Sequence, residues 1–262
     1  MLIEETLFGK VDKVQIAIDR IRQFEPEEGY YVAFSGGKDS CVILDLVKRA
    51  EVKYDAHYNL TTVDPPELVQ FIRKYHPNVE RHLPKETMWQ LIARKGDLPM
   101  RKSRWCCQIL KEGGGSGRTV ITGIRWEESV RRSKRKMVEA CNKEAKHFLH
   151  PIIDWTSNDI WQYIKDYAKI PYCSLYNEGY KRLGCVLCPM VHDVSKEIVR
   201  FPKIIQAYKN ACSKGFEVMK ERKERNSGIP ITWENSDDWF NWWVYKRDGR
   251  IKQDPDQTVM FE

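Results

Sequence analysis

The chain has 262 residues and a formal net charge of +7, from 44 Lys and Arg against 37 Asp and Glu. Apolar residues make up 42% of it, enough for a sizeable core, and no run of about 18 apolar residues exists that could cross a bilayer. The polar start MLIEETLFGK is not typical of a secretion signal, so we expect a cytoplasmic protein without membrane contact. Its eight cysteines are then reduced thiols unless a metal or catalysis uses them.

The predicted elements alternate between strands and helices along the first half of the chain. YYVAF (30–34) is a short apolar run rich in strand-forming residues, and apolar side chains recur at helical spacing on either side of it. This alternation predicts βαβ units and a parallel sheet. The elements expected in chain order are a helix over 1–27, a strand over 30–34, a helix over 39–50, a strand over 52–60, a helix from the Pro65–Pro66 pair through Tyr75, a strand near 79–82, a helix over 86–94, a short helix starting at Cys106 and a strand over 118–124.

After Arg125 the sequence becomes more charged and more helical. RRSKRK (131–136) is a basic run, and a short strand is expected around 147–152. Thr156 and Asp159 have the spacing of a capping box in front of an apolar helix. We therefore predict three parts: an N-terminal helix (1–27), an α/β domain (28–155) and a helical C-terminal region (156–262).

The stretch SGGKDS (35–40) follows a predicted strand and precedes a predicted helix. Its glycines accept backbone angles that turn main-chain N–H groups toward an anion, and the helix N-terminus adds a positive dipole end. A carboxylate repels phosphate, so Asp39 is either an acid at the helix start or a ligand for Mg²⁺ that bridges phosphates. The spacing differs from the Walker A pattern. The residues that we expect to hold the phosphates are Ser35, Gly36, Gly37, Lys38, Asp39 and Ser40.

SGGKDS resembles the PP-loop of the ATP pyrophosphatases, also called adenine nucleotide α-hydrolases. Three further segments resemble the phosphoadenosine phosphosulfate (PAPS) reductase family of that superfamily: TTVDPPELVQFI (61–72), TGIRWEESVRR (122–132) and the block 150–189. The resemblance implies a Rossmann-like parallel sheet flanked by helices, with residues 28–155 as the nucleotide-binding domain. It also implies Lys38, Asp39 and Arg125 as catalytic residues, Mg²⁺ held by Asp39 with help from Asp64, and nucleotide contacts from Asp64, Gly123, Arg125 and Arg132.

Two cysteine pairs supply four thiolates: the adjacent Cys106 and Cys107, and the CxxC pair Cys185 and Cys188. Four thiolates suffice for tetrahedral Zn²⁺ or for a cubane cluster, and adjacent cysteines are unusual for zinc. RWCCQILK and GCVLCP resemble the two elements that bind a [4Fe–4S] cluster in assimilatory adenylyl-sulfate reductases. The resemblance therefore implies a [4Fe–4S] cluster, with zinc or four incidental thiols as the alternatives.

The C-terminal sequence departs from the thiol-dependent members of the family. These end in a nucleophilic cysteine in a Glu-Cys-Gly-[IL]-His setting, whereas this sequence ends IKQDPDQTVMFE, and no cysteine follows Cys212. Cys212 fits the core face of a helix better than a nucleophile's position. We therefore expect the PP-loop to bind ATP and to activate an acceptor, such as tRNA or DNA, by adenylylation for iron–sulfur-assisted sulfur transfer from a separate donor.

Two other functions stay open. The chain could reduce adenylyl sulfate or PAPS with thiols from Cys212 or from a thioredoxin-like partner, or it could be a non-catalytic nucleotide-binding subunit. RRSKRK is either a polyanion-binding patch or an ordinary solvated face. Trp239, Trp242 and Trp243 fit core spacing better than base stacking. The sequence carries no signal for an oligomeric state.

Overall fold

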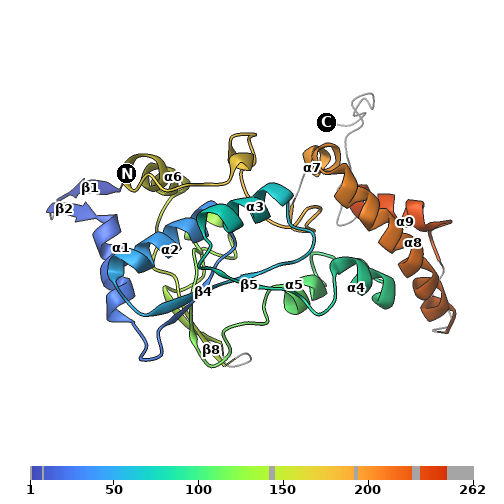
Figure 1. Ribbon diagram of the computed structural model, residues 1–262, viewed down its shortest axis with the longest axis horizontal. Helices are drawn as coiled ribbons and strands as arrows, with labels where there is room; N and C mark the ends of the chain where they lie inside the picture. Colours follow the sequence, from blue (N-terminus) through green and yellow to red (C-terminus); the bar gives the residue numbers. More distant parts are fainter. Residues whose placement is uncertain (1, 8, 142–144, 192–193, 226–230, 247–262) are drawn as a thin grey trace. The chain divides into compact units, whose positions relative to one another are not determined.

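Strands and helices alternate along the computed structural model of the protein (Figure 1), which describes residues 2–7, 9–141, 145–191, 194–225 and 231–246. The chain divides into two compact units. The first comprises Met1–Leu60, Asp64–Leu83 and Gly113–Gly184, and the second comprises Thr61–Val63, Pro84–Glu112 and Cys185–Glu262. None of the described helices combines the length and hydropathy that crossing a membrane requires.

A six-stranded sheet with the order β5-β4-β3-β6-β8-β7 organises the first unit. All neighbouring strands are parallel except β7, which runs antiparallel to β8. The strands are β3 (Tyr30–Ala33), β4 (Tyr54–Asn59), β5 (Glu80–His82), β6 (Thr119–Ile121), β7 (Val138–Cys141) and β8 (Lys146–Leu149). The helices are α1 (Lys13–Gln23), α2 (Lys38–Ala50), α3 (Pro66–Tyr75) and α6 (Ser157–Gln162), with the shorter turns η1 (Trp126–Glu128), η3 (Tyr163–Tyr167) and η4 (Ser174–Tyr176). The Rossmann-like parallel sheet flanked by helices is therefore confirmed, while edge strand β7 lay outside the prediction.

The strand order changes direction between β3 and β6. From β3 the chain adds β4 and then β5 on one side, and it later adds β6 and then β8 on the other side of β3. In open parallel sheets such a switch point leaves a crevice outside the carboxyl ends of the two central strands, where ligands bind. SGGKDS (35–40) follows β3, and Gly123 and Arg125 follow β6, so both predicted binding segments flank this point.

The predicted helix over 1–27 is wrong for its first half. Residues Ile3–Thr6 (β1) and Gly9–Asp12 (β2) form an antiparallel pair, and α1 begins only at Lys13. The Asp12 carboxylate accepts hydrogen bonds from the N–H groups of Val14 (2.8 Å) and Gln15 (3.1 Å), which fixes the start of the helix. Leu7 had the right spacing for the helix face, but it is exposed.

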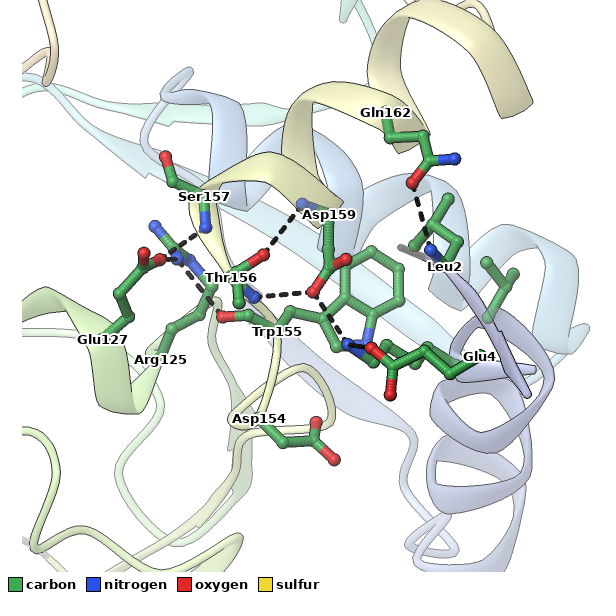
Figure 2. A network of polar contacts seen from close by, with 12 residues as sticks. Leu2, Glu4, Arg125, Glu127, Asp154, Trp155, Thr156, Ser157, Asp159 and Gln162 are labelled. Carbon is green, nitrogen blue, oxygen red and sulfur yellow. Dashed lines mark hydrogen bonds and ion pairs between the residues drawn. The ribbon is translucent and has the colours of Figure 1, made fainter. Parts of the chain in front are cut away.

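A buried carboxylate ties the predicted capping box to the N-terminal hairpin (Figure 2). The Asp159 side chain is fully buried; it accepts from the Thr156 N–H at 2.8 Å and from Lys13 Nζ at 3.0 Å, while the Thr156 hydroxyl accepts from the Asp159 N–H at 3.1 Å. Burial alone would raise the pKa of Asp159, but the hydrogen bonds from Thr156 and Lys13 outweigh it and lower the pKa to about 2. The capping box is confirmed, with the half-buried Lys13 as an additional partner.

We expect Asp159→Asn to reduce the free energy of unfolding by about 2 kcal/mol at neutral pH, because the lowered pKa makes the ionised carboxylate stabilising. The stabilisation is present above the ordinary carboxyl pKa and is lost as pH falls from about 4 to about 2. Urea unfolding of both proteins between pH 7 and pH 2 measures this. The control Asp154→Asn removes an exposed ion pair with Arg20 and should cost less than about 1 kcal/mol. A difference between variant and wild type that stays constant with pH would contradict the assignment.

The second unit is helical around a tryptophan-rich core. Helices α4 and α9 both pack on the long helix α8. Trp239 and Trp243 are buried, and Trp243 Nε1 donates to the Pro99 carbonyl at 2.8 Å, which confirms the core interpretation for these two side chains; Trp242 is half-buried. The Cys212 side chain is fully buried, as expected for a helix-face core residue. The elements are α4 (Met88–Lys95), α5 (Trp105–Leu110), α7 (Ser195–Arg200), α8 (Pro202–Arg225), α9 (Ser236–Asn241) and η5 (Trp242–Lys246).

Candidate functional site

The loop 35–40, called the PP-loop below, is a tight turn from β3 into α2. Gly36 has φ +70°, and a Cβ there would lie 2.7 Å from Leu68 Cδ1, so only glycine fits. Gly37 is the N-cap of α2 and has no side chain to cap the helix. The Ser40 hydroxyl accepts from the Ser35 N–H at 3.2 Å and donates to the Gly37 carbonyl at 2.9 Å, so the serines hold the turn itself.

A tyrosine that the sequence argument did not single out completes the loop. The Lys38 N–H donates to the Tyr176 hydroxyl at 2.9 Å, and Lys38 Nζ lies 5.9 Å from the centre of the same ring. Burial raises the pKa of Tyr176, so its hydroxyl stays neutral and can both accept and donate. The only sequence signal was the tyrosine-rich stretch after the capping-box helix, which carries no periodicity that would aim one hydroxyl at the loop.

Two buried cations converge on Asp39. Arg125 Nε donates to Asp39 Oδ1 at 2.8 Å, and Lys38 Nζ donates to Asp39 Oδ2 at 3.1 Å. Arg125 is 3% exposed and Lys38 is 6% exposed. Arg125 Nη1 also donates to Glu127 Oε2 at 2.8 Å and to the Trp155 carbonyl at 3.3 Å (Figure 2). The structure therefore brings together the three residues predicted to be catalytic.

Gly123 allows this convergence. A Cβ at Gly123 would lie 2.9 Å from the Asp39 carbonyl oxygen and 3.0 Å from Asp39 Cβ, so the end of β6 touches the first turn of α2. This close approach is the physical reason for glycine two residues before Arg125, because any side chain would push the two central strand ends apart.

We expect Gly123→Ala to cost about 1–3 kcal/mol of folding free energy and to weaken nucleotide binding, because overpacking against backbone atoms separates Arg125 from Asp39. The matched control is Gly113→Ala, since a Cβ there would meet no atom within 4 Å. Chemical unfolding and nucleotide titration of both variants measure the two effects. Equal stability of the two variants would show that the close approach has no energetic consequence.

Asp39 is the predicted Mg²⁺ ligand, and that role stays a prediction. Its Oδ2 pairs with Lys38 and its Oδ1 with Arg125, and each oxygen keeps a lone pair for a further partner. Asp64 is half-buried and lies just before the Pro65 N-cap of α3, at the carboxyl edge of β4. Lys38 and Arg125 themselves supply the positive charge for which a metal was invoked.

The charge of a further arginine, Arg132, interacts with the same carboxylate. Burial, followed by the positive charges of Arg182, Arg135 and Arg125, lowers the pKa of Arg132 to about 10, against the opposing effect of Asp39. Arg132 also pairs with Glu128. After burial, the neighbouring positive charges contribute to this lowering, so an anion bound beside Arg132 would be favourable. Arg132 and Arg135 belong to the basic run RRSKRK, whereas Arg182 carried no signal in the sequence.

The two cysteine pairs meet in the second unit. The pKa of Cys106 is raised by its hydrogen bond with Cys107, by burial and by the charges of Cys107, Cys185 and Cys188, so all four thiols act on one another. The hydrogen bond from Cys106 lowers the pKa of Cys107 to about 6; burial opposes this, and Lys111 and Arg104 assist it. Thiolate character beside two cations suits the first ligand of a metal centre.

The CxxC pair lies in a strained turn. Leu187 has φ +57°, an uncommon conformation for a bulky residue, and its N–H donates to Glu197 Oε2 at 2.7 Å. The Cys188 N–H donates to the Cys185 carbonyl at 3.2 Å, and Cys185 Sγ donates to the Thr61 hydroxyl at 3.3 Å. Strain of this kind persists only where neighbouring contacts fix the backbone, which is common at ligand sites. No three of the four thiols, all of them in the described part of the chain, place their sulfur atoms within 4.8 Å of one another, so a metal centre at these cysteines stays a prediction.

The remaining cysteines include three buried thiols. Burial raises the pKa values of Cys41 and Cys173 in the first unit, and it raises the pKa of Cys212 in the second to about 12. Cys141 is half-buried on edge strand β7. A thiol that is buried and protonated is a poor nucleophile, so Cys41, Cys173 and Cys212 are suited to packing and not to attack.

Comparison with known proteins connects these features to one family. The phosphoadenosine phosphosulfate reductase domain family matches residues 29–191. An uncharacterized protein of Methanocaldococcus jannaschii is 30% identical over 237 residues, which is 82% of this chain and 46% of that protein. The adenosine 5'-phosphosulfate reductase of Oceanobacillus iheyensis is 31% identical over 167 residues, 60% of this chain and 69% of the reductase. The chain thus spans about half the length of the archaeal relative.

A solved structure agrees on the fold. The crystal structure of phosphoadenylyl-sulfate reductase from Candida auris, in its phosphate complex, matches with a TM-score of 0.50 at 20% identity, covering 64% of this chain and 87% of that one. The family match covers the PP-loop, the Gly123–Arg125 segment and both cysteine pairs. The chain belongs to the phosphoadenosine phosphosulfate reductase domain family.

Proposed function

We propose that the protein is a sulfonucleotide reductase that binds adenylyl sulfate or PAPS at the switch point and releases sulfite with electrons from an external dithiol. The main observation that supports this proposal is the group of cations that interact with Asp39: Lys38, Arg125 and Arg132. An adenylyl sulfate offers the phosphate and sulfate oxygens that such a group binds. Similarity to adenosine 5'-phosphosulfate reductases supports this substrate class over ATP.

The reaction balances with two thiols per sulfonucleotide. A thiolate of the dithiol attacks the sulfate sulfur, and the bond between that sulfur and the bridging phosphate oxygen breaks. The nucleotide leaves with the electron pair, as AMP from adenylyl sulfate or as adenosine 3',5'-bisphosphate from PAPS. The second thiol then attacks the dithiol sulfur that carries the sulfonate and releases sulfite, leaving a disulfide and two protons. Sulfur is thereby reduced by two electrons. Because Cys41, Cys173 and Cys212 are buried, we assign the dithiol to a thioredoxin-like partner.

Each residue of this group has a defined part in this reaction. Lys38 and Arg125 neutralise the charge that develops on the leaving phosphate. The Arg132 guanidinium binds the sulfate, and the anion relieves the repulsion from its arginine neighbours. The Tyr176 hydroxyl orients the first N–H of α2. Burial of Lys38 and Arg125 keeps water from weakening these charges.

We further propose that Cys106, Cys107, Cys185 and Cys188 hold a [4Fe–4S] cluster, supported by their mutual electrostatic coupling. Such a cluster, when bound, supplies a redox-active centre, and no step above depends on it. The negative charge of a cluster would be offset by Arg104 and Lys111, which already act on Cys107.

A second candidate function is ATP-dependent adenylylation of an acceptor such as tRNA or DNA. The observation in its favour is that three of the cysteines outside the paired set are buried, so the chain lacks a ready nucleophile among them. The PP-loop would then bind the triphosphate, and a sulfur donor would act on the adenylylated acceptor.

Product analysis of the anaerobically purified chain separates these functions. The chain is incubated with adenylyl sulfate or PAPS plus thioredoxin, and with ATP plus tRNA or DNA, and sulfite and pyrophosphate are measured. Thiol-dependent sulfite release that is lost in Lys38→Met and kept in Arg131→Ala would support the reductase. Pyrophosphate release without sulfite would overturn it in favour of adenylylation, and nucleotide binding without either product would indicate a non-catalytic subunit.

A further inference from the structure

Two histidines and a glutamate meet on one face of the sheet in the first unit. In the register of β4 and β5, His57 pairs with Glu80 and Asn59 pairs with His82, so alternate positions place all three functional side chains together. His57 Nδ1 lies 2.8 Å from His82 Nε2 and 3.4 Å from Glu80 Oε2. One ligand atom from each residue lies within 4.8 Å of the other two.

Neighbouring side chains fix the orientation of His57. Its Nε2 donates to the Asp55 carboxylate, and Arg118 Nη1 donates to Asp55 Oδ2 at 2.7 Å. The Tyr31 ring stacks on His57 with the ring centres 4.1 Å apart and the planes 6° apart. Burial alone would raise the pKa of Asp55, but the hydrogen bonds from Arg118 and His57 outweigh it and lower the pKa, so the carboxylate is ionised and accepts the proton of Nε2.

This hydrogen bond determines which nitrogen of His57 is free to coordinate. With Nε2 protonated toward Asp55, the neutral ring carries its lone pair on Nδ1, the atom that faces His82 and Glu80. The His57 Nδ1, the His82 Nε2 and the Glu80 carboxylate therefore face one point, where a cation would meet three donor atoms.

We propose that His57, Glu80 and His82 bind a divalent transition-metal ion of the Zn²⁺ or Co²⁺ type, with a fourth position open to water. Imidazole and carboxylate donors in this number suit such ions, and the Asp55–His57 bond is the outer-shell contact that orients a ligating histidine. The site is separate from the four cysteines, and the inference does not depend on the proposed function.

The charged or titratable groups that face the site are Tyr31 on β3, Asp55 on β4, Glu80 on β5 and Arg118 before β6. Arg118 is already paired with Asp55, so it leaves Glu80 available for the ion.

Cobalt absorption spectroscopy of the intact chain tests the site, because thiolate-bound Co²⁺ has a charge-transfer band that cobalt bound by nitrogen and oxygen lacks. We expect the chain to bind one equivalent of Co²⁺ that shows no thiolate band. This bound Co²⁺ should be lost in His82→Ala and in His57→Ala. The matched control His147→Ala removes an exposed imidazole on β8 and should leave this Co²⁺ binding intact. Asp55→Asn should weaken the Co²⁺ affinity about 10–100-fold.

Two outcomes would overturn the proposal. One is that all bound cobalt shows the thiolate band; the other is that His147→Ala reduces the thiolate-free component as much as His82→Ala does. Circular dichroism of each variant separates loss of binding from loss of folding, and Glu80→Gln offers a change at an exposed side chain that leaves the strand pairing in place.

Discussion

Arg125→Ala should weaken adenine-nucleotide binding by about 100-fold or more and reduce the free energy of unfolding by about 3 kcal/mol. A charged hydrogen bond to an anion contributes about 1.5–3 kcal/mol, and each 1.4 kcal/mol corresponds to tenfold in affinity. Removing a 3%-exposed guanidinium also takes one of two cations from Asp39 and the cation from Glu127, which is the costly way to break a buried pair. Isothermal titration and urea unfolding measure the two losses.

Three further variants separate the functional loss from the structural one. Arg131→Ala removes an exposed charge from the basic run, so it should change both quantities little. Arg125→Lys keeps the charge but cannot contact Asp39, Glu127 and the Trp155 carbonyl together, so it should recover only part of the affinity. Asp39→Asn in the Arg125→Ala background also removes the carboxylate beside Lys38, so it should restore neither stability nor binding. Unchanged nucleotide affinity in Arg125→Ala would exclude Arg125 from the nucleotide site.

The second large effect is expected at the cysteine set, where Cys106→Ser should abolish metal binding and unfold the second unit. Structural metal sites contribute on the order of 10 kcal/mol to folding, and Cys106 is the most buried of the four thiols. Iron, sulfide and zinc analysis after anaerobic purification measures the content, and thermal unfolding followed by tryptophan fluorescence measures the stability of the Trp239–Trp243 core.

Cys141→Ser is the matched control, because it changes a half-buried thiol on edge strand β7 in the other unit and should leave metal content intact. Iron with an equal amount of sulfide in the wild type would identify a cluster, and zinc alone would identify a mononuclear site. If Cys106→Ser kept the full metal content, the ion would have to be bound elsewhere, and the four-cysteine assignment would be wrong.

Local sequence patterns predicted the features that depend on neighbouring residues. The Gly-Gly turn between a strand and a helix located the PP-loop, and Thr156 with Asp159 located a helix start. The alternation of strands and helices predicted a parallel sheet, which is confirmed, while the place of Arg125 beside Lys38 and Asp39 was expected from the family resemblance of residues 122–132. The turn, the helix start and the sheet could be predicted because each depends on backbone chemistry within a few residues or on a known rule of strand order.

The features that sequence reasoning missed depend on register and on distant side chains. Nothing near Tyr176 indicates that its hydroxyl meets the Lys38 N–H, 138 residues away. The His57–Glu80–His82 group exists only because β4 and β5 pair in one particular register, and a slip of one residue would turn His57 to the other face. The segment that forms the β1–β2 hairpin was predicted as helix because Val11 fits both the spacing of a helix and the alternation of a strand. The Asp12 N-cap sets the start of the helix at Lys13.

The measurement that tests the central claim most directly is equilibrium binding of adenylyl sulfate to the intact chain and to two neighbouring arginine variants. We predict saturable binding that Arg132→Ala weakens about 10–100-fold, since its guanidinium is half-buried among other cations, and that Arg131→Ala leaves unchanged because its side chain is exposed. Absence of binding, or an equal loss in both variants, would contradict the assignment of the switch point as a sulfonucleotide site.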